Sequence, residues 1–124
     1  MLSRRSVLIA GAVFTVTGAT AARAHHGWTW AEGALIDVTG VIKSAKLGNP
    51  HGLLTITAKD GDWTVEVGQP WRNERAGLKD SMLVKGVTLT VRGNRTKDPK
   101  LKVIKAVRVI IDGKNYDLYP ERIS

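Results

Sequence analysis

Three histidines are the residues of this sequence best suited to bind a metal ion. His25 and His26 are adjacent near the N-terminus, and His51 directly follows Asn49 and Pro50. The sequence contains no cysteine, which excludes disulfides, thiolate metal sites and cysteine nucleophiles. Met82 is the only methionine after the N-terminal segment, so a methionine-rich Cu(I) site has no support, and histidines are the main candidate ligands.

The importance of His25 depends on the segment before it, because residues 1–24 have the features of a cleavable secretion signal. A basic start is followed by an apolar run from Val7 to about Val16, and Ala22-Arg23-Ala24 matches an A-x-A cleavage site. The apolar run is shorter than the ~20 residues that a membrane-spanning helix needs, so an uncleaved anchor is the less favoured alternative. The start Ser3-Arg4-Arg5-Ser6 is typical of a twin-arginine signal, but Sec signals can also carry paired arginines. We expect a periplasmic protein, exported by either route, with no membrane span after cleavage.

Cleavage after Ala24 would give His25 a free α-amine beside its ring nitrogen. The reference pKa values are about 7.7–8.0 for the amine and about 6.5 for imidazole, so both groups lose a proton easily near neutral pH. His51 could add a third nitrogen, which gives the T-shaped arrangement called a histidine brace. Alternatively, His26 could bind through its ring, the intervening amide and the terminal amine. Both nitrogen sets favour Cu(II), with zinc or nickel as second choices.

Other readings of these histidines stay open. A His-His pair at a chain terminus can simply be solvated, and the His51 ring can stabilise its turn by bonding to a backbone group. Reach is a further concern, because a strand over 34–45 could separate its start from His51 by up to ~40 Å, whereas residues 25–33 span ~30 Å at most. Possible supporting residues are Glu66, Trp28 and Asn49, although packing is the favoured role for Trp28. The favoured reading of Glu66 and Asp62 is a pair of charges on a solvated strand face.

Alternating apolar and polar residues predict a β-rich domain. We expect strands over 35–43, 54–59, 62–67, 87–92 and 103–111, a helix over 70–78 and a short edge strand over 116–118. Asp60-Gly61 predicts a hairpin with positive φ at both residues, and Gly40 predicts a bulge or a bend. We expect a polar loop over Asn94–Lys100. We also expect Trp63 to lie in the core and Trp71 to close one end of the barrel. The order of three strands, a helix and two strands is that of an all-β, OB-fold-like five-stranded antiparallel barrel (β-β-β-α-β-β), with a plain antiparallel sandwich as the alternative.

The expected organisation is a signal at 1–24, an N-terminal arm at 25–33 and one barrel domain at 34–124. The net charge of the whole chain is +8, and removing Arg4, Arg5 and Arg23 leaves +5 on the mature domain. A solvated surface explains this moderate charge, and nucleic acid is a poor partner for an exported protein. A metal ion is the expected ligand, and another periplasmic or membrane protein is a possible partner.

Several motifs resemble one small exported bacterial family, the domain of unknown function 6152. These are the His25-His26 start, Asn49-Pro50-His51, and the segments 38–41, 63–70, 75–78 and 87–93. Family members often carry a large residue such as tryptophan before Asn-Pro-His, where this chain has Leu47-Gly48. The resemblance implies a secreted single domain with an OB-like barrel, and it implies no activity.

The combined expectation is a periplasmic copper-binding protein for delivery, buffering or resistance, with His25, His26 and His51 as the candidate ligands. The alternative is a non-metal binding module that holds an oligosaccharide, peptide or partner protein on the open face of the barrel. In that case basic residues such as Arg72, Arg75, Arg92 and Arg95 would matter and the histidines would not. The sequence shows no nucleophile elbow or phosphate-binding loop, so we expect no enzymatic activity.

Overall fold

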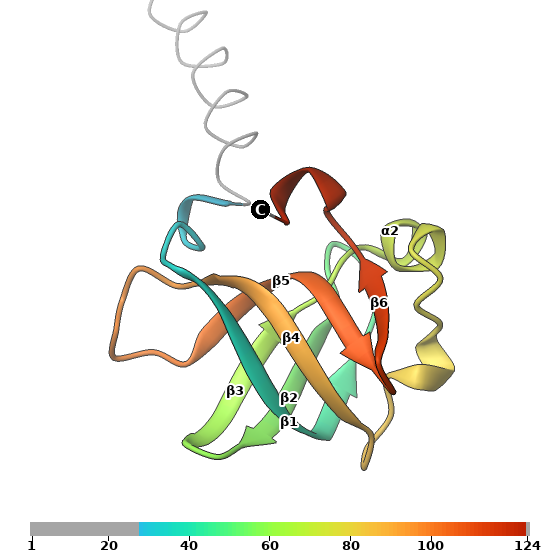
Figure 1. Cartoon of the computed structure of the whole chain (residues 1–124), viewed down its shortest axis with the longest axis horizontal. Coiled ribbons are helices and arrows are strands. Elements are labelled where there is room, and N and C mark those ends of the chain that lie inside the picture. The colour runs from blue at the N-terminus through green and yellow to red at the C-terminus, as the bar shows by residue number, and fades with distance from the viewer. Residues whose placement is uncertain (1–27, 124) are drawn as a thin grey trace, which may run out of the picture. The chain divides into compact units, whose positions relative to one another are not determined.

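The computed structural model describes residues 28–123 of the chain (Figure 1). The chain divides into two compact units, Met1–Trp30 and Ala31–Ser124, and the fold described below is that of the second unit. The predicted ligands His25 and His26 and the predicted cleavage site lie outside the described residues. No helix in the described part of the chain is long and apolar enough to cross a membrane.

The second unit is a small β-barrel with one short helix, as the sequence predicts. Its elements in chain order are β1 (Leu35–Lys46), β2 (Leu53–Ala58), β3 (Gly61–Glu66), α2 (Pro70–Arg75), a 3₁₀ turn (Asp80–Met82), β4 (Thr88–Arg95), β5 (Val103–Ile111), β6 (Lys114–Asp117) and a second 3₁₀ turn (Pro120–Arg122). Pro70 begins the helix, and Gly77 follows it with φ +85°, as expected for a helix that ends at a glycine.

Strand pairing closes five of these strands into a barrel. The sheet order is β3-β2-β1-β4-β5-β6, and a pairing between β3 and β5 joins the first and fifth strands of that order. All neighbours in the sheet are antiparallel except β3 and β5, which run parallel. In Figure 1, β6 continues the sheet beyond β5, and α2 lies beside it.

The barrel core is apolar and follows the alternation of the strands except in β5, where the four consecutive residues 104–107 are buried. The fully buried side chains include Ile42, Leu54, Ile56, Val65, Leu89, Val91, Ile104, Val107 and Leu118. Trp63 is also buried, as predicted, and its indole Nε1 donates a hydrogen bond to Asp60 Oδ1 at 2.9 Å. A domain of this size with such a core can be stable without a disulfide or a structural metal ion.

Two local predictions were wrong in detail. The register shift of β1 lies between Ile42 and Ser44, so Gly40 is not a bulge. The alternative of a bend at Gly40 agrees with the pairing, which changes from β4 to β2 at Gly40 and Val41. At Gly40 a side chain would instead meet the Thr57 carbonyl oxygen at 2.7 Å, so the glycine permits close approach of β2. In the β2–β3 hairpin only Gly61 has positive φ, whereas both residues of the later Asp112-Gly113 turn do.

Two further predictions were wrong because neighbouring elements change the environment. Trp71 does not plug the barrel, since 51% of its surface is exposed; the helix directs Asn73 inward instead. Asn94 and Arg95 belong to β4 and not to a loop, because β5 and the start of β1 pair with the strand up to those residues.

Candidate functional site

His51 lies in the loop between β1 and β2, where backbone contacts hold the end of the loop against β3. Val67 N donates to Gly52 O at 2.9 Å, and Gly52 N donates to Gly68 O at 3.4 Å. A side chain at position 52 would meet Val67 Cγ2 at 2.8 Å, so glycine allows this approach. The contact places His51 beside the C-terminal end of β3.

One row of paired residues runs around the barrel at this level. Lys46 pairs with Leu53, Leu53 with Glu66, Glu66 with Lys105, Lys105 with Asn94, and Asn94 with Leu35 at the other end of β1. Residues paired directly opposite one another place their side chains on the same face. The closure between β3 and β5 therefore brings Glu66 and Lys105 side by side, although they are far apart in sequence.

Glu66 is at the centre of a small polar cluster. Lys105 Nζ lies 3.0 Å from Glu66 Oε2, and His51 Nδ1 lies 3.7 Å from Glu66 Oε1. The side chains of Lys105, Glu66 and His51 are 3%, 17% and 23% exposed. The Lys105 contact is an ion pair by distance, but within the described part of the chain Glu66 Oε2 makes no contact with hydrogen-bond geometry. The expectation that Glu66 is a solvated surface charge was therefore wrong, whereas Asp62 is exposed and pairs with Lys43.

Tyr119 and Arg72 cover this cluster from the side of the C-terminal segment. The Tyr119 ring centre lies 5.9 Å from Lys105 Nζ and 4.2 Å from the Arg72 guanidinium carbon. Arg72 also stacks on Trp71 at 4.6 Å and donates to Leu118 O at 3.1 Å. Its Nε is buried and makes no hydrogen bond to the residues that the structure describes. The guanidinium thus lies near two aromatic rings, a favourable position for a cation.

The electrostatic environment keeps His51 neutral. Burial lowers the pKa of its imidazole, and the positive charges of Lys105 and Arg72 lower it further, while the Glu66 carboxylate acts in the opposite direction. Metal binding requires the neutral form of an imidazole. His51 is therefore ready to act as a ligand without first losing a proton at neutral pH.

The segment after Glu66 is fixed by Asn73, whose side chain is buried. Its Oδ1 accepts from Gly68 N at 2.9 Å, and its Nδ2 donates to Gly68 O at 3.0 Å. This pair of bonds connects α2 to the end of β3. It fixes the position of α2, which carries Arg72, relative to the end of β3, which carries Glu66.

Strand pairing defines a path along the barrel wall from the start of β1 to the cluster. Leu35 lies three ladder steps from Glu66, by way of Asn94 and Lys105, and strands are about 4.8 Å apart, so this path measures about 15 Å along the wall. This ladder path is shorter than the separation of up to ~40 Å expected along an extended β1. Just before β1, Gly33 N donates to Arg95 O at 3.0 Å and Gly33 O accepts from Asn94 Nδ2 at 3.2 Å. The chain preceding the barrel is thus attached at the level of the cluster.

The structure brings together only some of the predicted site residues. Asn49 is exposed in the His51 loop and lines a small pocket there with His51. Trp28 belongs to the first unit, so its predicted role stays a prediction. Among residues 28–123 no three histidine, aspartate or glutamate side chains group to hold a metal ion. Sequence reasoning missed Lys105 and Tyr119; the available signal was a lysine inside the apolar run Val103–Ile111.

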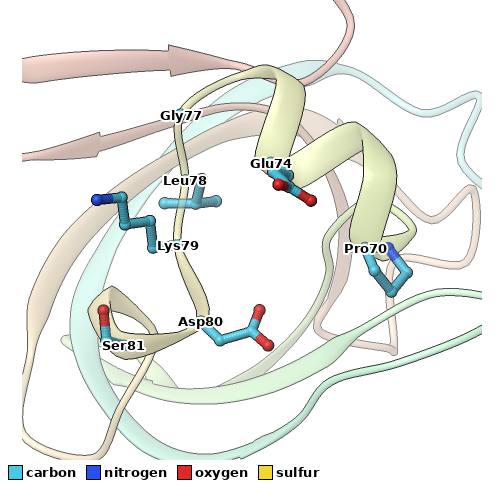
Figure 2. A pocket seen from close by; sticks show the side chains of 7 residues that line it. All are labelled: Pro70, Glu74, Gly77, Leu78, Lys79, Asp80 and Ser81. Carbon is cyan, nitrogen blue, oxygen red and sulfur yellow. The ribbon is translucent and has the colours of Figure 1, made fainter.

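A second hollow lies between α2 and the 3₁₀ turn that follows it, with a volume of about 450 Å³. Figure 2 shows the carboxylates of Glu74 and Asp80 facing this opening from opposite sides, while Lys79 extends away from it. Leu78, which is buried, lines it between them. The two exposed carboxylates make this hollow acidic. Among the residues that line it, no histidine or third carboxylate is present to complete a metal site.

Comparison with known proteins supports the fold and leaves the activity open. A family of unknown function, DUF6152, matches residues 12–105, and the chain belongs to that family. None of the curated proteins matches it. A crystal structure of the ZRD-deleted mutant of TiaS in complex with agmatine is 18% identical, with a TM-score of 0.50 over 66% of this chain and 25% of that chain. The crystal structure of apo TiaS is 19% identical, with a TM-score of 0.47 over 60% of this chain and 17% of that chain. The chain thus spans a quarter or less of these structures, and the likeness concerns the fold alone.

Proposed function

We propose that this protein binds copper in the periplasm, through a mature N-terminal His25 and the loop residue His51, and serves in copper handling. The observation that carries the proposal is the setting of His51. Its imidazole is partly buried and neutral, and its Nδ1 faces the Glu66 carboxylate at 3.7 Å. Histidines that bind metals usually present their other ring nitrogen to a carboxylate or carbonyl in this way.

The charge balance around His51 supports copper over hard cations. Glu66 carries one negative charge, while Lys105 and Arg72 each carry a positive one, so the surroundings offer no excess of negative charge to Ca²⁺ or Mg²⁺, which need oxygen ligands. A Cu(II) ion bound by nitrogen lone pairs depends less on such charge, and nitrogen ligands favour Cu(II) among divalent ions. Zinc and nickel remain second choices.

The path length along the barrel supports a contribution from the N-terminus. A fully extended segment from His25 to Ala34 would span ~30 Å, about twice the ~15 Å along the wall from Leu35 to Glu66, and the turn at residues 28–31 shortens that span. It could therefore bring a terminal amine and the His25 ring to His51 without being fully extended.

The alternative of a binding module on the open barrel face has less support. Arg92 makes two hydrogen bonds to Asp37, at 2.8 and 3.0 Å. Arg95 donates to Leu101 O at 2.9 Å and stacks on Trp63 at 5.3 Å. Arg72 donates to Leu118 O at 3.1 Å, so three of the four arginines expected to meet a ligand already contact other groups of the chain.

The test is the intact mass of the exported protein, followed by Cu(II) titration of the same material. A mass that begins at His25 and a single tight copper site are expected. His51→Gln should weaken Cu(II) binding about a hundredfold or more, because loss of a direct ligand costs at least as much as loss of a supporting residue. His26→Gln is the matched control and should leave affinity nearly unchanged. The reverse pattern would assign copper to the terminal amine, amide and His26 set, and a start other than His25 would refute the proposal.

A further inference from the structure

The pairing of Lys105 with Glu66 fixes how the carboxylate meets His51. The two oxygens of Glu66 have different neighbours, with Oε2 at 3.0 Å from Lys105 Nζ and Oε1 at 3.7 Å from His51 Nδ1. Because both oxygens belong to one planar group, holding Oε2 limits where Oε1 can point. The lysine itself has little freedom, since 3% of its side chain is exposed and it lies against the Tyr119 ring.

We propose that Lys105 is the positioning residue of the His51 site: it orients the Glu66 carboxylate so that His51 keeps its proton on Nδ1 and presents Nε2 as the ligand atom. The role of Nε2 as ligand rests on the function proposed above, whereas the position of the proton does not. A carboxylate oxygen attracts an N–H and repels a lone pair, and this holds at 3.7 Å, a distance longer than a direct hydrogen bond. A free imidazole favours the opposite form, with the proton on Nε2, so the effect of Lys105 can be measured.

Packing alone does not account for a lysine at this position. β5 is otherwise apolar here, with Ile104, Ala106 and Val107 completely buried, and an aliphatic side chain would fill the same space without the cost of burying an ammonium group. The register between β3 and β5 places Lys105 directly opposite Glu66. The charged groups that act on His51 come from three elements, namely Glu66 on β3, Lys105 on β5 and Arg72 on α2. Of the two cations, Lys105 is in ion-pair contact with Glu66.

Lys105 also keeps Glu66 in a supporting role. A carboxylate already neutralised by a buried ammonium group is a weaker direct ligand, so His51 and not Glu66 would hold the metal ion. This arrangement favours copper held by nitrogen over a mixed nitrogen and oxygen site.

The test is the tautomer of His51, read from its ring ¹⁵N chemical shifts in the metal-free mature protein at a pH where the imidazole is neutral. The unaltered protein should show Nδ1–H as the main form. Lys105→Met should move the population towards Nε2–H and weaken Cu(II) binding about ten- to a hundredfold, the usual effect of losing an outer partner. Lys105→Arg, which keeps the charge, should restore much of both. The matched control is Lys43→Met, since Lys43 also pairs with a carboxylate at 3.0 Å, on the exposed surface, and it should change neither.

The outcomes separate this inference from the proposed function. If His51 carries its proton on Nε2 in the unaltered protein, or keeps Nδ1–H in Lys105→Met, the positioning role is refuted even where copper binds through His51. If the tautomer changes as expected but no variant or parent binds copper tightly, the positioning role stands and the proposed function fails. If Lys105→Met does not fold, the double variant Lys105→Met/Glu66→Leu removes the isolated charge. Because that double variant also removes the carboxylate that faces His51, the lysine itself is then tested by Lys105→Gln, which keeps Glu66: loss of Nδ1–H in Lys105→Gln supports the positioning role, and its retention refutes it.

Discussion

The barrel carries two lysine–carboxylate pairs with the same separation and different surroundings. Lys43 Nζ lies 3.0 Å from Asp62 Oδ2, and Lys105 Nζ lies 3.0 Å from Glu66 Oε2. In the first pair the side chains are 61% and 44% exposed, and in the second they are 3% and 17% exposed. Distance alone therefore says little about the two pairs, because water screens the first and is excluded from most of the second.

The two carboxylates also occupy equivalent positions in their strand. Asp62 and Glu66 both lie on β3 and both point away from the barrel interior. They differ in what lies next to the strand: β5 pairs with β3 only from Thr64 to Glu66, and Tyr119 then covers the Lys105 side. The closure of the barrel thus converts one end of an ordinary outward face into a buried polar site.

The largest expected effect is on stability when the buried pair is broken. Lys105→Met leaves the Glu66 carboxylate largely buried without its partner, and such a loss typically costs about 3–5 kcal/mol of unfolding free energy. Urea unfolding followed by tryptophan fluorescence measures it. The double variant Lys105→Met/Glu66→Leu should recover most of the loss, because an apolar pair leaves no isolated charge. A single-variant loss below about 1 kcal/mol would mean that Glu66 remains hydrated, as a surface pair is.

The fold could be predicted from the sequence because its signals are local. Alternation identified every strand of the barrel, and β5 was predicted with its observed limits, Val103–Ile111. Pro70 and Gly77 marked the short helix. The errors arose where a residue's surroundings depend on distant elements: Trp71 is exposed because the helix turns Asn73 inward, and Asn94 is in a strand because β1 and β5 pair with it.

The site could be predicted only in part, for the same reason. The spacing of Asn49, Pro50 and His51 identified a loop histidine, but no local pattern shows that Lys105 meets Glu66. That contact depends on the parallel closure of β3 on β5, between residues about forty positions apart. The roles proposed for His25, His26 and Trp28 stay predictions, since they depend on the mature N-terminus.

A smaller effect is expected in the pH dependence of stability near the buried pair. Burial holds the pKa of His51 below the ordinary value near 6.5 that applies in the unfolded chain. Between these two pKa values the unfolded state binds more protons than the folded state, so stability rises with pH. The contribution of His51 is therefore fully present above pH ~6.5 and is lost as the pH falls through the folded pKa. Unfolding free energies of the parent and His51→Gln, measured from about pH 5 to 8, should differ most above pH ~7. A constant difference would show that His51 is hydrated like a surface residue.

The smallest expected effect is at the exposed pair, where the pKa of Asp62 should change while the unfolding free energy should not. The Lys43 ammonium and the Thr57 hydroxyl, which donates to Asp62 Oδ1 at 3.1 Å, hold the pKa of the Asp62 carboxyl below its ordinary value. Lys43→Met should raise that pKa towards the ordinary value, which an NMR titration of the Asp62 carboxyl carbon measures. The urea midpoint should not move detectably, because solvent replaces the lost partner. If Lys43→Met instead destabilised the barrel as much as Lys105→Met does, burial would not be what separates the two pairs. Both pairs would then stabilise the barrel in the same way, by connecting strands, β1 to β3 in one case and β5 to β3 in the other.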